Sequence, residues 1–466
     1  MLQTFLNIFR VPELRNKVLF TLLMLAIYRV GYHIPLPGVD QAAFAAIIEE
    51  QNQNSAAARL GSYLSLFSGG TLSQSTIFGL GVMPYISASI IFQLLATVVP
   101  ALERLKKEGQ TGQRKIQEWT RYATVPIAAL QGTFWLSFIA GQDLVLPGFE
   151  TSFWILGMLA LTAGTIFLMW LGEQIDEYGL GNGISLIILA GIVAQMPAAI
   201  YTLIDRFGVD PSNTAKDISI GDLITLVLCF LFVTGGAIAI TQAQRRIPIQ
   251  QAKHTRGRKV YGGTRQYLPL RVNHGGVMPI IFAQSLMLFP GVFFGYLNGV
   301  VNREGTADGV FAQTVSFLNT EFSGYGGFLY TMTEVGLIFF FSYFWTTVQF
   351  QPKEMANQLR DYGSFVPGLR PGKRTAEYLE KVMYRITFVG AAFLSAIAII
   401  PMTVSSMLGI PFQVTAFLGG TGLLIVVSVA LDMVQRIEAN LLMRNFSGFL
   451  AGDPKTKSKR IRGRQY

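Results

Sequence analysis

The sequence predicts an all-α polytopic membrane protein with ten transmembrane helices in two inverted five-helix halves. Three observations predict this fold: the composition, the length of the apolar blocks, and a short motif that occurs twice. Of the 466 residues, 51% are apolar and only 14% are charged, whereas a soluble protein carries about 25% charged residues. This composition excludes an ordinary soluble protein and favours a chain that lies mostly in lipid.

The apolar residues fall in blocks of about 20, the length that a helix needs to cross the hydrocarbon core of a bilayer. The ten predicted spans are 18–36, 76–98, 122–140, 154–172, 183–203, 221–242, 275–297, 328–350, 384–404 and 413–433. The single cysteine, Cys229, lies inside an apolar run, so no disulfide is expected and a buried, inert thiol is the simplest interpretation. The three histidines are far apart in sequence and indicate no metal site.

The positive charges predict the orientation of the chain. Segments on one side of the predicted spans carry 32 lysines and arginines, and segments on the other side carry four. Because cytoplasmic segments are enriched in Lys and Arg, both termini are expected in the cytoplasm. The net charge of +10 therefore reflects topology and does not indicate nucleic-acid binding.

The repeated motif predicts the arrangement of the spans. GVMPYISAS at 81–89 returns 195 positions later as GVMPIIFAQ at 276–284, with six of the nine residues identical. The copies lie in the second and seventh spans, which run in opposite directions, as an inverted repeat of five plus five helices requires. The predicted domains are an N-tail 1–17, a first half 18–203, a connection 204–220, a second half 221–433 with cytoplasmic loops 243–273 and 351–383, and a basic tail 434–466.

Helical spacing places aliphatic and polar residues of each copy on one face of its helix. In the first copy these residues are Val82, Ile86, Ser89 and Gln93, and in the second they are Val277, Ile281 and Gln284. Such a face is typical of close packing between membrane helices with a proline kink. It is equally typical of the wall of a central path, and the spacing alone does not choose between these interpretations.

Two loops carry features of their own. Residues 62–76 are too short to span and too apolar for an exposed loop, which favours a half-helix folded back into the protein. The segment GSFVPGLRPGKRT at 363–375 resembles a phosphate loop superficially, but it has three spacers instead of four and lacks the Ser or Thr after the lysine. We interpret it as a rigid basic tip presented to a partner, with a solvated turn as the alternative.

Catalytic chemistry is not expected from this sequence. Charged residues within the predicted spans are few, and no aspartate pair, nucleophile elbow or Ser/His arrangement is recognisable. No metal or cofactor is therefore predicted. Two classes of function remain at this point: a secondary transporter of a small solute, which would need an ion-coupling site, and a passive pore for a larger cargo with docking loops on one face.

Several longer stretches resemble the SecY family, the central subunit of the bacterial protein-translocation channel. The stretches that carry the resemblance are IPLPGVD (34–40), FSGGTLSQSTIFGLGVMPYISASIIFQLL (67–95), EGQTGQRKIQEWTRYAT (108–124), MWLGEQIDEYGLGNGISLIILAGIVA (169–194), RRIPIQ (245–250), YLPLRVNHGGVMPIIFA (267–283), GSFVPGLRPGKRTAEYL (363–379) and GGTGLLIVVSVALD (419–432). The resemblance implies a pore between the two halves, closed by a ring of aliphatic side chains and a short plug. The implied function is passage of unfolded polypeptides across the membrane and lateral release of hydrophobic segments into lipid.

The resemblance also implies site residues, which are carried over by motif. The pore ring falls on Val82, Ile86, Ile184, Ile188, Ile281 and Ile425. The plug falls on about 61–73, with Leu64, Phe67, Ser68, Gly69 and Gly70. The lateral gate lies between the second and seventh spans, with Ser87, Gln93 and Asn273 as its polar seam.

The implied partners bind on the cytoplasmic side and in the membrane. Docking of the SecA motor ATPase and of the ribosome, including ribosomal RNA, falls on Arg256, Arg258, Lys259, Arg370, Lys373 and Arg374, with Arg370 expected as the main contact. The small membrane subunits SecE and SecG, secretory precursors with their signal peptides, and membrane lipid complete the implied partners. The implied location is the bacterial inner membrane.

Overall fold

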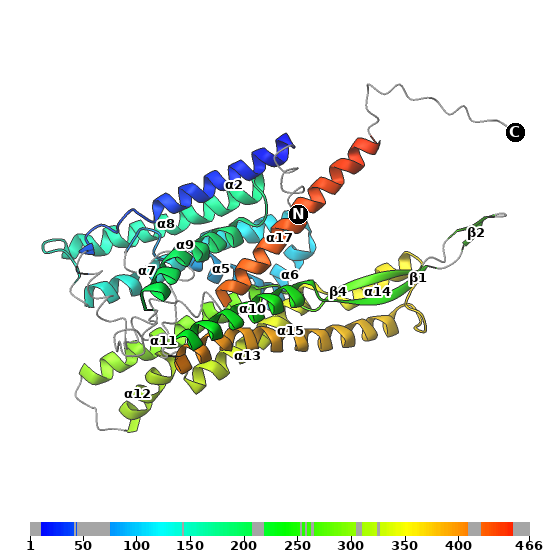
Figure 1. Cartoon of the computed structure of the whole chain (residues 1–466). Coiled ribbons are helices and arrows are strands. Elements are labelled where there is room, and N and C mark those ends of the chain that lie inside the picture. Colours follow the sequence, from blue (N-terminus) through cyan, green and yellow to red (C-terminus); the bar gives the residue numbers. More distant parts are fainter. Residues whose placement is uncertain are drawn as a thin grey trace.

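The computed structural model describes most of the chain but leaves out the predicted plug. The described residues are 11–41, 43, 75–141, 144–206, 219–251, 254–256, 259–261, 265–303, 310–323, 327–408 and 421–450. Figure 1 shows helices bundled along a common long direction, with a small β-structure projecting from one end of the bundle. We call this the sheet end of the molecule.

Helices make up the body of the protein. They are α2 (Pro12–Gly31), α5 (Met83–Val98), α6 (Pro100–Lys107), α7 (Gln110–Gly141), α8 (Glu150–Tyr178), α9 (Gly183–Arg206), α10 (Ile220–Gln242), α11 (Met278–Arg303), α12 (Val310–Ser323), α13 (Phe328–Gln349), α14 (Pro352–Asp361), α15 (Lys373–Leu408) and α17 (Thr421–Leu450). Each of the ten spans predicted from the sequence overlaps one of them, namely α2, α5, α7, α8, α9, α10, α11, α13, α15 or α17.

Not every one of these helices is long and apolar enough to cross a bilayer by itself. Among the described residues six qualify by length and composition: α7, α8, α9, α10, α13 and α15. Helices α5 and α6 meet at a bend of 103° and add a seventh if they form one span. The all-α polytopic fold predicted from the sequence is confirmed, whereas the count of ten spans stays a prediction.

Local chemistry explains where several helices begin. Proline stands in the first turn of α2, α5, α6 and α14, where its missing N–H breaks no helical hydrogen bond. Helix α10 begins with a capping box, in which Asp222 Oδ2 accepts from the Ser219 N–H at 2.9 Å. Val99, the residue before Pro100, is extended, because proline disfavours a helical conformation in the residue before it. The chain therefore turns sharply between α5 and α6.

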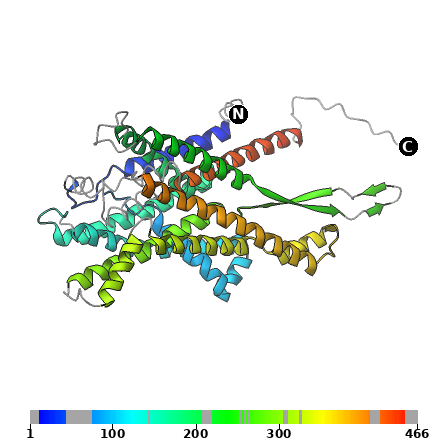
Figure 2. The ribbon, with the colours of Figure 1, turned by 60° about the horizontal axis from the view of Figure 1, so that its bottom comes forward.

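The two predicted loops 243–273 and 351–383 contain strands that the sequence analysis did not predict. Strands β1 (Gln244–Gln251), β4 (Arg265–Arg271) and β5 (Ser364–Phe365) form an antiparallel sheet in the order β4-β1-β5. Strands β2 (His254–Arg256) and β3 (Lys259–Tyr261) form a separate hairpin. Figure 2 shows this hairpin as an extension of β1 and β4 away from the helices.

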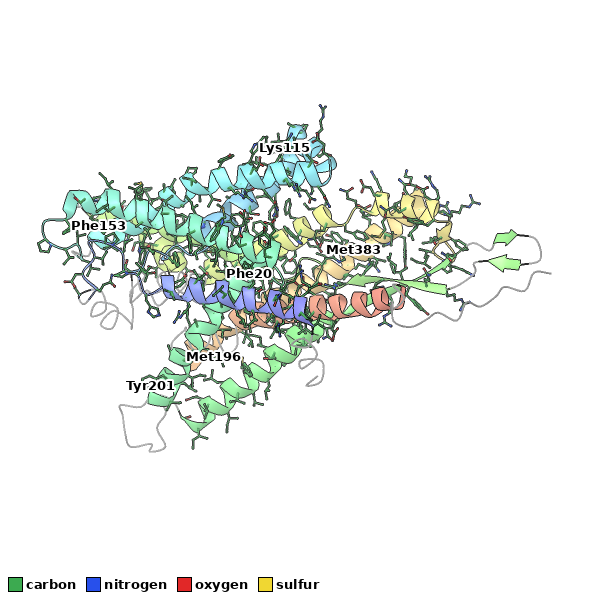
Figure 3. The ribbon with its side chains drawn as sticks, turned by 90° about the horizontal axis from the view of Figure 1, so that it is seen from above. Phe20, Lys115, Phe153, Met196, Tyr201 and Met383 are labelled. Carbon is green, nitrogen blue, oxygen red and sulfur yellow. The ribbon has the colours of Figure 1, made fainter. Side chains whose placement is uncertain are left out.

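The largest cluster of buried side chains is central, and two of the smaller clusters lie toward opposite ends of the bundle. The central cluster takes residues from nine helices, α2, α5, α8, α9, α10, α11, α13, α15 and α17. A second cluster includes Phe153, which Figure 3 shows at the end away from the sheet. A third includes Met383, on the sheet side of the same view. The central cluster therefore lies midway along the bundle.

Candidate functional site

The two copies of the repeated motif fold into the same local structure. Gly81 and Gly276 have φ angles of +56° and +60°, a left-handed conformation that glycine adopts without steric cost. Each glycine is followed three residues later by a proline, Pro84 or Pro279, at the start of α5 or α11. The motif is therefore a turn that starts a helix in the middle of the bundle.

The GLGNG segment before α9 is a second such helix start. The Asn182 Oδ1 atom accepts a hydrogen bond from the Ser185 N–H at 3.0 Å, and Asp176 Oδ1 accepts from the Gly183 N–H at 2.7 Å. These two side chains satisfy N–H groups that a helix start leaves without partners. A Cβ on Gly183 would lie 1.9 Å from the Gly172 carbonyl oxygen, so glycine permits close contact between α8 and α9.

These helix starts carry the predicted pore-ring residues into the central cluster. Five of them are at most 6% exposed and belong to the central cluster: Val82, Ile86, Ile188, Ile281 and Ile425. The sixth, Ile184, is partly buried and packs against the same cluster. The six residues come from four places in the chain, at the starts of α5, α9, α11 and α17.

The predicted plug residues, Leu64, Phe67, Ser68, Gly69 and Gly70, lie outside the described residues. The structure does describe the two ends of the segment that contains them. The Leu36 N–H donates to the Ser75 carbonyl at 2.8 Å, and the Ile77 N–H donates to the Ile34 carbonyl at 3.2 Å. The Gln41 amide also donates to the Ser75 carbonyl, at 3.1 Å. These hydrogen bonds therefore fasten the two ends of the segment to each other.

The predicted gate residues occupy α5 and the turn before α11. Ser87 is buried, and the Gln93 amide donates to Ser89 Oγ at 3.1 Å within α5. The Asn273 amide donates to the Gly276 carbonyl at 2.8 Å within its own turn. The structure records no hydrogen bond between Asn273 and either α5 residue.

A direct contact between α5 and α11 involves a different pair. Ser285 Oγ lies 3.9 Å from Met83 Sδ, and both side chains are buried, while the Ser285 hydroxyl donates to the Ile281 carbonyl of its own helix at 2.7 Å. Sequence reasoning missed this pair, although Ser285 directly follows Gln284 on the face predicted for α11. Met83 belongs to the motif itself, but a methionine in an apolar run gives no signal of a polar contact.

The docking candidates lie on a surface that the two predicted loops build together. Strand β1 of the first loop pairs with β5 of the second, with Gln250 opposite Phe365. Beneath the sheet, one apolar cluster combines residues of both loops and of α15: Ile247, Leu270, Phe350, Val366, Leu379, Val382, Met383 and Ile386. The two loops therefore form one folded unit, which we call the two-loop surface.

On this surface the candidates fall into two groups. Arg370, Lys373 and Arg374 are exposed around the turn that leads into α15, and Thr375 Oγ1 donates to the Arg370 carbonyl at 2.9 Å. Gly368 and Gly372 flank Arg370 with φ angles of +85° and +106°, so the turn is tight.

The other group lies on the projecting hairpin. Arg256 of β2 stands opposite Lys259 of β3, and Arg258 lies outside the described residues. The structure thus separates this group from the turn around Arg370, which lies where β5 joins the sheet.

Comparison with known proteins identifies the family. The SecY family profile matches residues 76–434. The chain is 39% identical to protein translocase subunit SecY of Thermotoga maritima and 40% identical to that of Thermus thermophilus, in each case over 100% of both chains.

Solved channel structures share the fold. A structure described as a protein conducting channel aligns with a TM-score of 0.58 at 17% identity, over 95% of each chain. Sec61 in the canine ribosome-channel complex from the endoplasmic reticulum aligns with a TM-score of 0.57 at 19% identity, again over 95% of each chain. At these identities the likeness shows the fold alone. Together with the sequence relatives, it establishes that the chain belongs to the SecY family of protein translocase channel subunits.

Proposed function

We propose that the six clustered aliphatic residues form the constriction of the channel, through which an unfolded polypeptide passes. The single observation that carries this proposal is their convergence from four helix starts into one buried cluster. A ring of aliphatic side chains excludes water and blocks ions at rest. Because its side chains can move, the same ring closes around a passing chain. The sequence composition left a small-solute transporter and a passive pore as alternatives. The family assignment decides between them: the protein is a channel subunit and not an enzyme or a small-solute transporter.

In this proposal the two halves of the chain, 18–203 and 221–433, are inverted repeats around the constriction. The matched turns at Gly81 and Gly276 support it, because they place equivalent residues at the start of α5 and of α11. The segment of about 61–73 is the plug. Its fastened ends at Leu36 and Ser75 limit how far it can travel from the pore.

The gate for lateral release lies between α5 and α11. Ser87, Gln93 and Asn273 are its polar residues, and we add the contact between Met83 and Ser285. Polar contacts between membrane helices contribute only about 0.6–2 kcal/mol each. A hydrophobic signal segment can therefore compete with them and pass into lipid.

The two-loop surface is the docking site for the partners that drive transport. Two solved relatives of the same fold are described in complexes with ribosomes, the canine Sec61 channel and the yeast Ssh1 complex. Arg370 lies on a tight, exposed turn, and its planar guanidinium suits both carboxylate and phosphate groups. We extend this to SecA and the ribosome as motors, SecE and SecG as membrane subunits, and a bacterial inner-membrane location with cytoplasmic termini.

Ion conductance tests the constriction directly. We expect that Ile86→Ser and Ile281→Ser raise the ion conductance of the complex in planar bilayers, because each places a hydroxyl in a ring that must stay dry. Ile91→Ser and Leu286→Ser are matched controls, since both residues lie on the same helices but are exposed. The assignment of the ring is wrong if the ring variants conduct no more than these controls.

A further inference from the structure

Helix α12 lies between α11 and α13 in the chain and is held in place by contacts at its C-terminal end. Phe322 packs in one cluster with Tyr330 and Leu337 of α13. The Leu329 N–H donates to Glu321 Oε2 at 3.1 Å. The C-terminal end of α12 therefore lies beside the first turns of α13, a helix long and apolar enough to cross the bilayer.

Helix α12 also packs along α11. The rings of Phe294 and Phe322 are stacked with their centroids 5.4 Å apart. A Cβ on Gly295 would lie 3.7 Å from Asn319 Oδ1. Helix α12 therefore packs against both α11 and α13. It lies at the end of the molecule away from the sheet (Figure 1).

The surface of α12 divides into three sectors at helical spacing. Ala312 and Val315 are buried against the protein. A second sector is exposed and mainly apolar, with Val310 81%, Phe311 67% and Phe317 58% exposed. It also contains the exposed Thr314 and the partly buried Glu321, whose carboxylate accepts from the Leu329 N–H. The third sector is exposed and polar, and its members are Gln313, Ser316 and Thr320. An apolar exposed sector between a buried and a polar one is typical of a helix that lies at a membrane interface.

The apolar sector of α12 has exposed apolar neighbours on α11 and α13. Phe293 on α11 and Phe328 and Met332 on α13 are large, apolar and exposed. They lie at the same end of the two helices against which α12 packs. The described residues of α12 include no lysine or arginine, so attraction to anionic headgroups does not contribute. The partner that fits this sector is the uncharged acyl and carbonyl region of a phospholipid leaflet.

We propose that α12 is an interfacial helix, with Val310, Phe311 and Phe317 covered by phospholipid in the leaflet at the end away from the sheet. Packed against α11, it holds that helix at a fixed height in the bilayer. Because α12 runs from Val310 toward the start of α13, Phe317 lies deeper in the leaflet than Phe311. This inference requires only that the chain spans a membrane, so it does not depend on the proposed ring or gate.

Site-directed spin labelling tests the proposal, and the chain suits it because Cys229 is its single cysteine. In a Cys229→Ser background, F311C and F317C place a label in the apolar sector, and Q313C and T320C place it in the polar one. The assembled complex is reconstituted in phosphatidylcholine vesicles. Collision rates are then measured with oxygen, which concentrates in lipid, and with a water-soluble nickel chelate. We expect oxygen to dominate at 311 and 317, more strongly at 317, and nickel to dominate at 313 and 320.

Two outcomes overturn the proposal. If 311 and 317 are as accessible to nickel as 313 and 320, the sector lies in water. If both reagents are excluded from 311 and 317, another protein segment covers it.

A second measurement addresses the role of the helix without labels in the sector. Phe311→Ser with Phe317→Ser should raise amide hydrogen exchange across 310–323 in vesicles, whereas Gln313→Ser should leave it unchanged. Equal exchange in both variants would mean that lipid does not hold α12.

Discussion

Ile86 and Ile281 occupy equivalent places in two helices whose starts are 195 residues apart. The Ile86 N–H donates to the Val82 carbonyl at 3.1 Å, and the Ile281 N–H donates to the Val277 carbonyl at 3.2 Å. In each helix this is a bond of the first turn, directly after a left-handed glycine. The same backbone path therefore places two isoleucines in the central cluster from opposite parts of the sequence.

The left-handed glycine of the second copy gives the first prediction. We expect Gly276→Ala to destabilise the protein by about 1–2 kcal/mol, the cost of an L-residue in the left-handed region. No atom lies within 4 Å of a Cβ at this position, so the loss reflects backbone strain alone. Gly276→Asn should recover part of it, because asparagine tolerates this conformation better. Thermal unfolding of the purified complex measures the effect.

Gly336→Ala is the control for this prediction. Gly336 lies within α13, has no positive φ and likewise has no atom within 4 Å of a Cβ. Alanine there should be neutral or slightly stabilising. An equal loss of stability in Gly276→Ala and Gly336→Ala would contradict the role assigned to the turn at Gly276.

A bond between distant parts of the chain gives the second prediction. Thr21 Oγ1 on α2 accepts a hydrogen bond from the Leu180 N–H at 3.0 Å, and both residues are buried. Thr21→Val leaves that N–H without a partner, which costs about 1–3 kcal/mol, whereas Thr21→Ser keeps the acceptor. We expect faster hydrogen exchange around Leu180 in the valine variant only.

Thr225→Val is the matched control for Thr21→Val. The Thr225 hydroxyl is exposed and donates only to the Gly221 carbonyl of its own helix. Its loss should leave both stability and exchange near the native values. Unchanged exchange at Leu180 in Thr21→Val would show that this bond does not hold the GLGNG segment.

Sequence reasoning predicted some parts of this architecture and not others, for physical reasons. Long apolar blocks predicted the helices, because a segment that crosses the bilayer must be apolar and must pair its backbone groups internally. The GVMP repeat predicted that α5 and α11 begin in the same way. The choice of Ile86, Ile281 and Ile425 needed the family resemblance, since an isoleucine in a membrane helix does not indicate which way it faces. The bond between Thr21 and Leu180 joins residues 159 positions apart, and no local pattern predicts such a contact.

The sheet was missed for a related reason. The segment QRRIPIQQ alternates polar and apolar residues, with Ile247 and Ile249 buried. This alternation is the strand signal, but its arginines were interpreted only as markers of topology. The pairing of β1 with β5 could not be predicted, because β5 has two residues and lies more than a hundred positions away.

A buried polar pair between α11 and α13 gives the third prediction. Glu334 is 1% exposed, and its carboxyl group lies beside the Gln284 side chain. Neither carboxyl oxygen has a hydrogen-bond partner among the described residues. An ionised group is expensive at membrane depth, so Glu334→Gln should be as stable as the native protein or more stable. Gln284→Leu should lose about 1–3 kcal/mol, because it replaces the polar side chain beside the buried carboxyl group with an apolar one.

Glu334→Leu separates the contribution of the polar contact from that of the carboxylate charge. If the polar contact matters and the charge does not, the leucine variant unfolds at a lower temperature than the glutamine variant. Equal destabilisation of Glu334→Gln and Glu334→Leu would instead mean that the carboxylate itself is required.

The turn around Arg370 gives the fourth prediction, which tests the docking surface. We expect Arg370→Glu to slow SecA-driven transport of a precursor into vesicles, because it reverses the charge at the exposed tip of the two-loop surface. Arg370 contributes its carbonyl to the turn through Thr375, and substitution of the side chain leaves that bond in place. The folded unit beneath it, centred on Leu379, should therefore keep its stability.

Lys381→Glu is the matched control, since Lys381 is exposed on α15 more than two turns beyond that tip. It makes the same change of charge on the same folded unit. If electrostatic contact at the tip drives docking, Arg370→Glu lowers the affinity for SecA and added salt weakens native binding as well. Loss of transport with unchanged affinity would place Arg370 in a step after docking. Normal transport by Arg370→Glu would show that the tip is not the main contact.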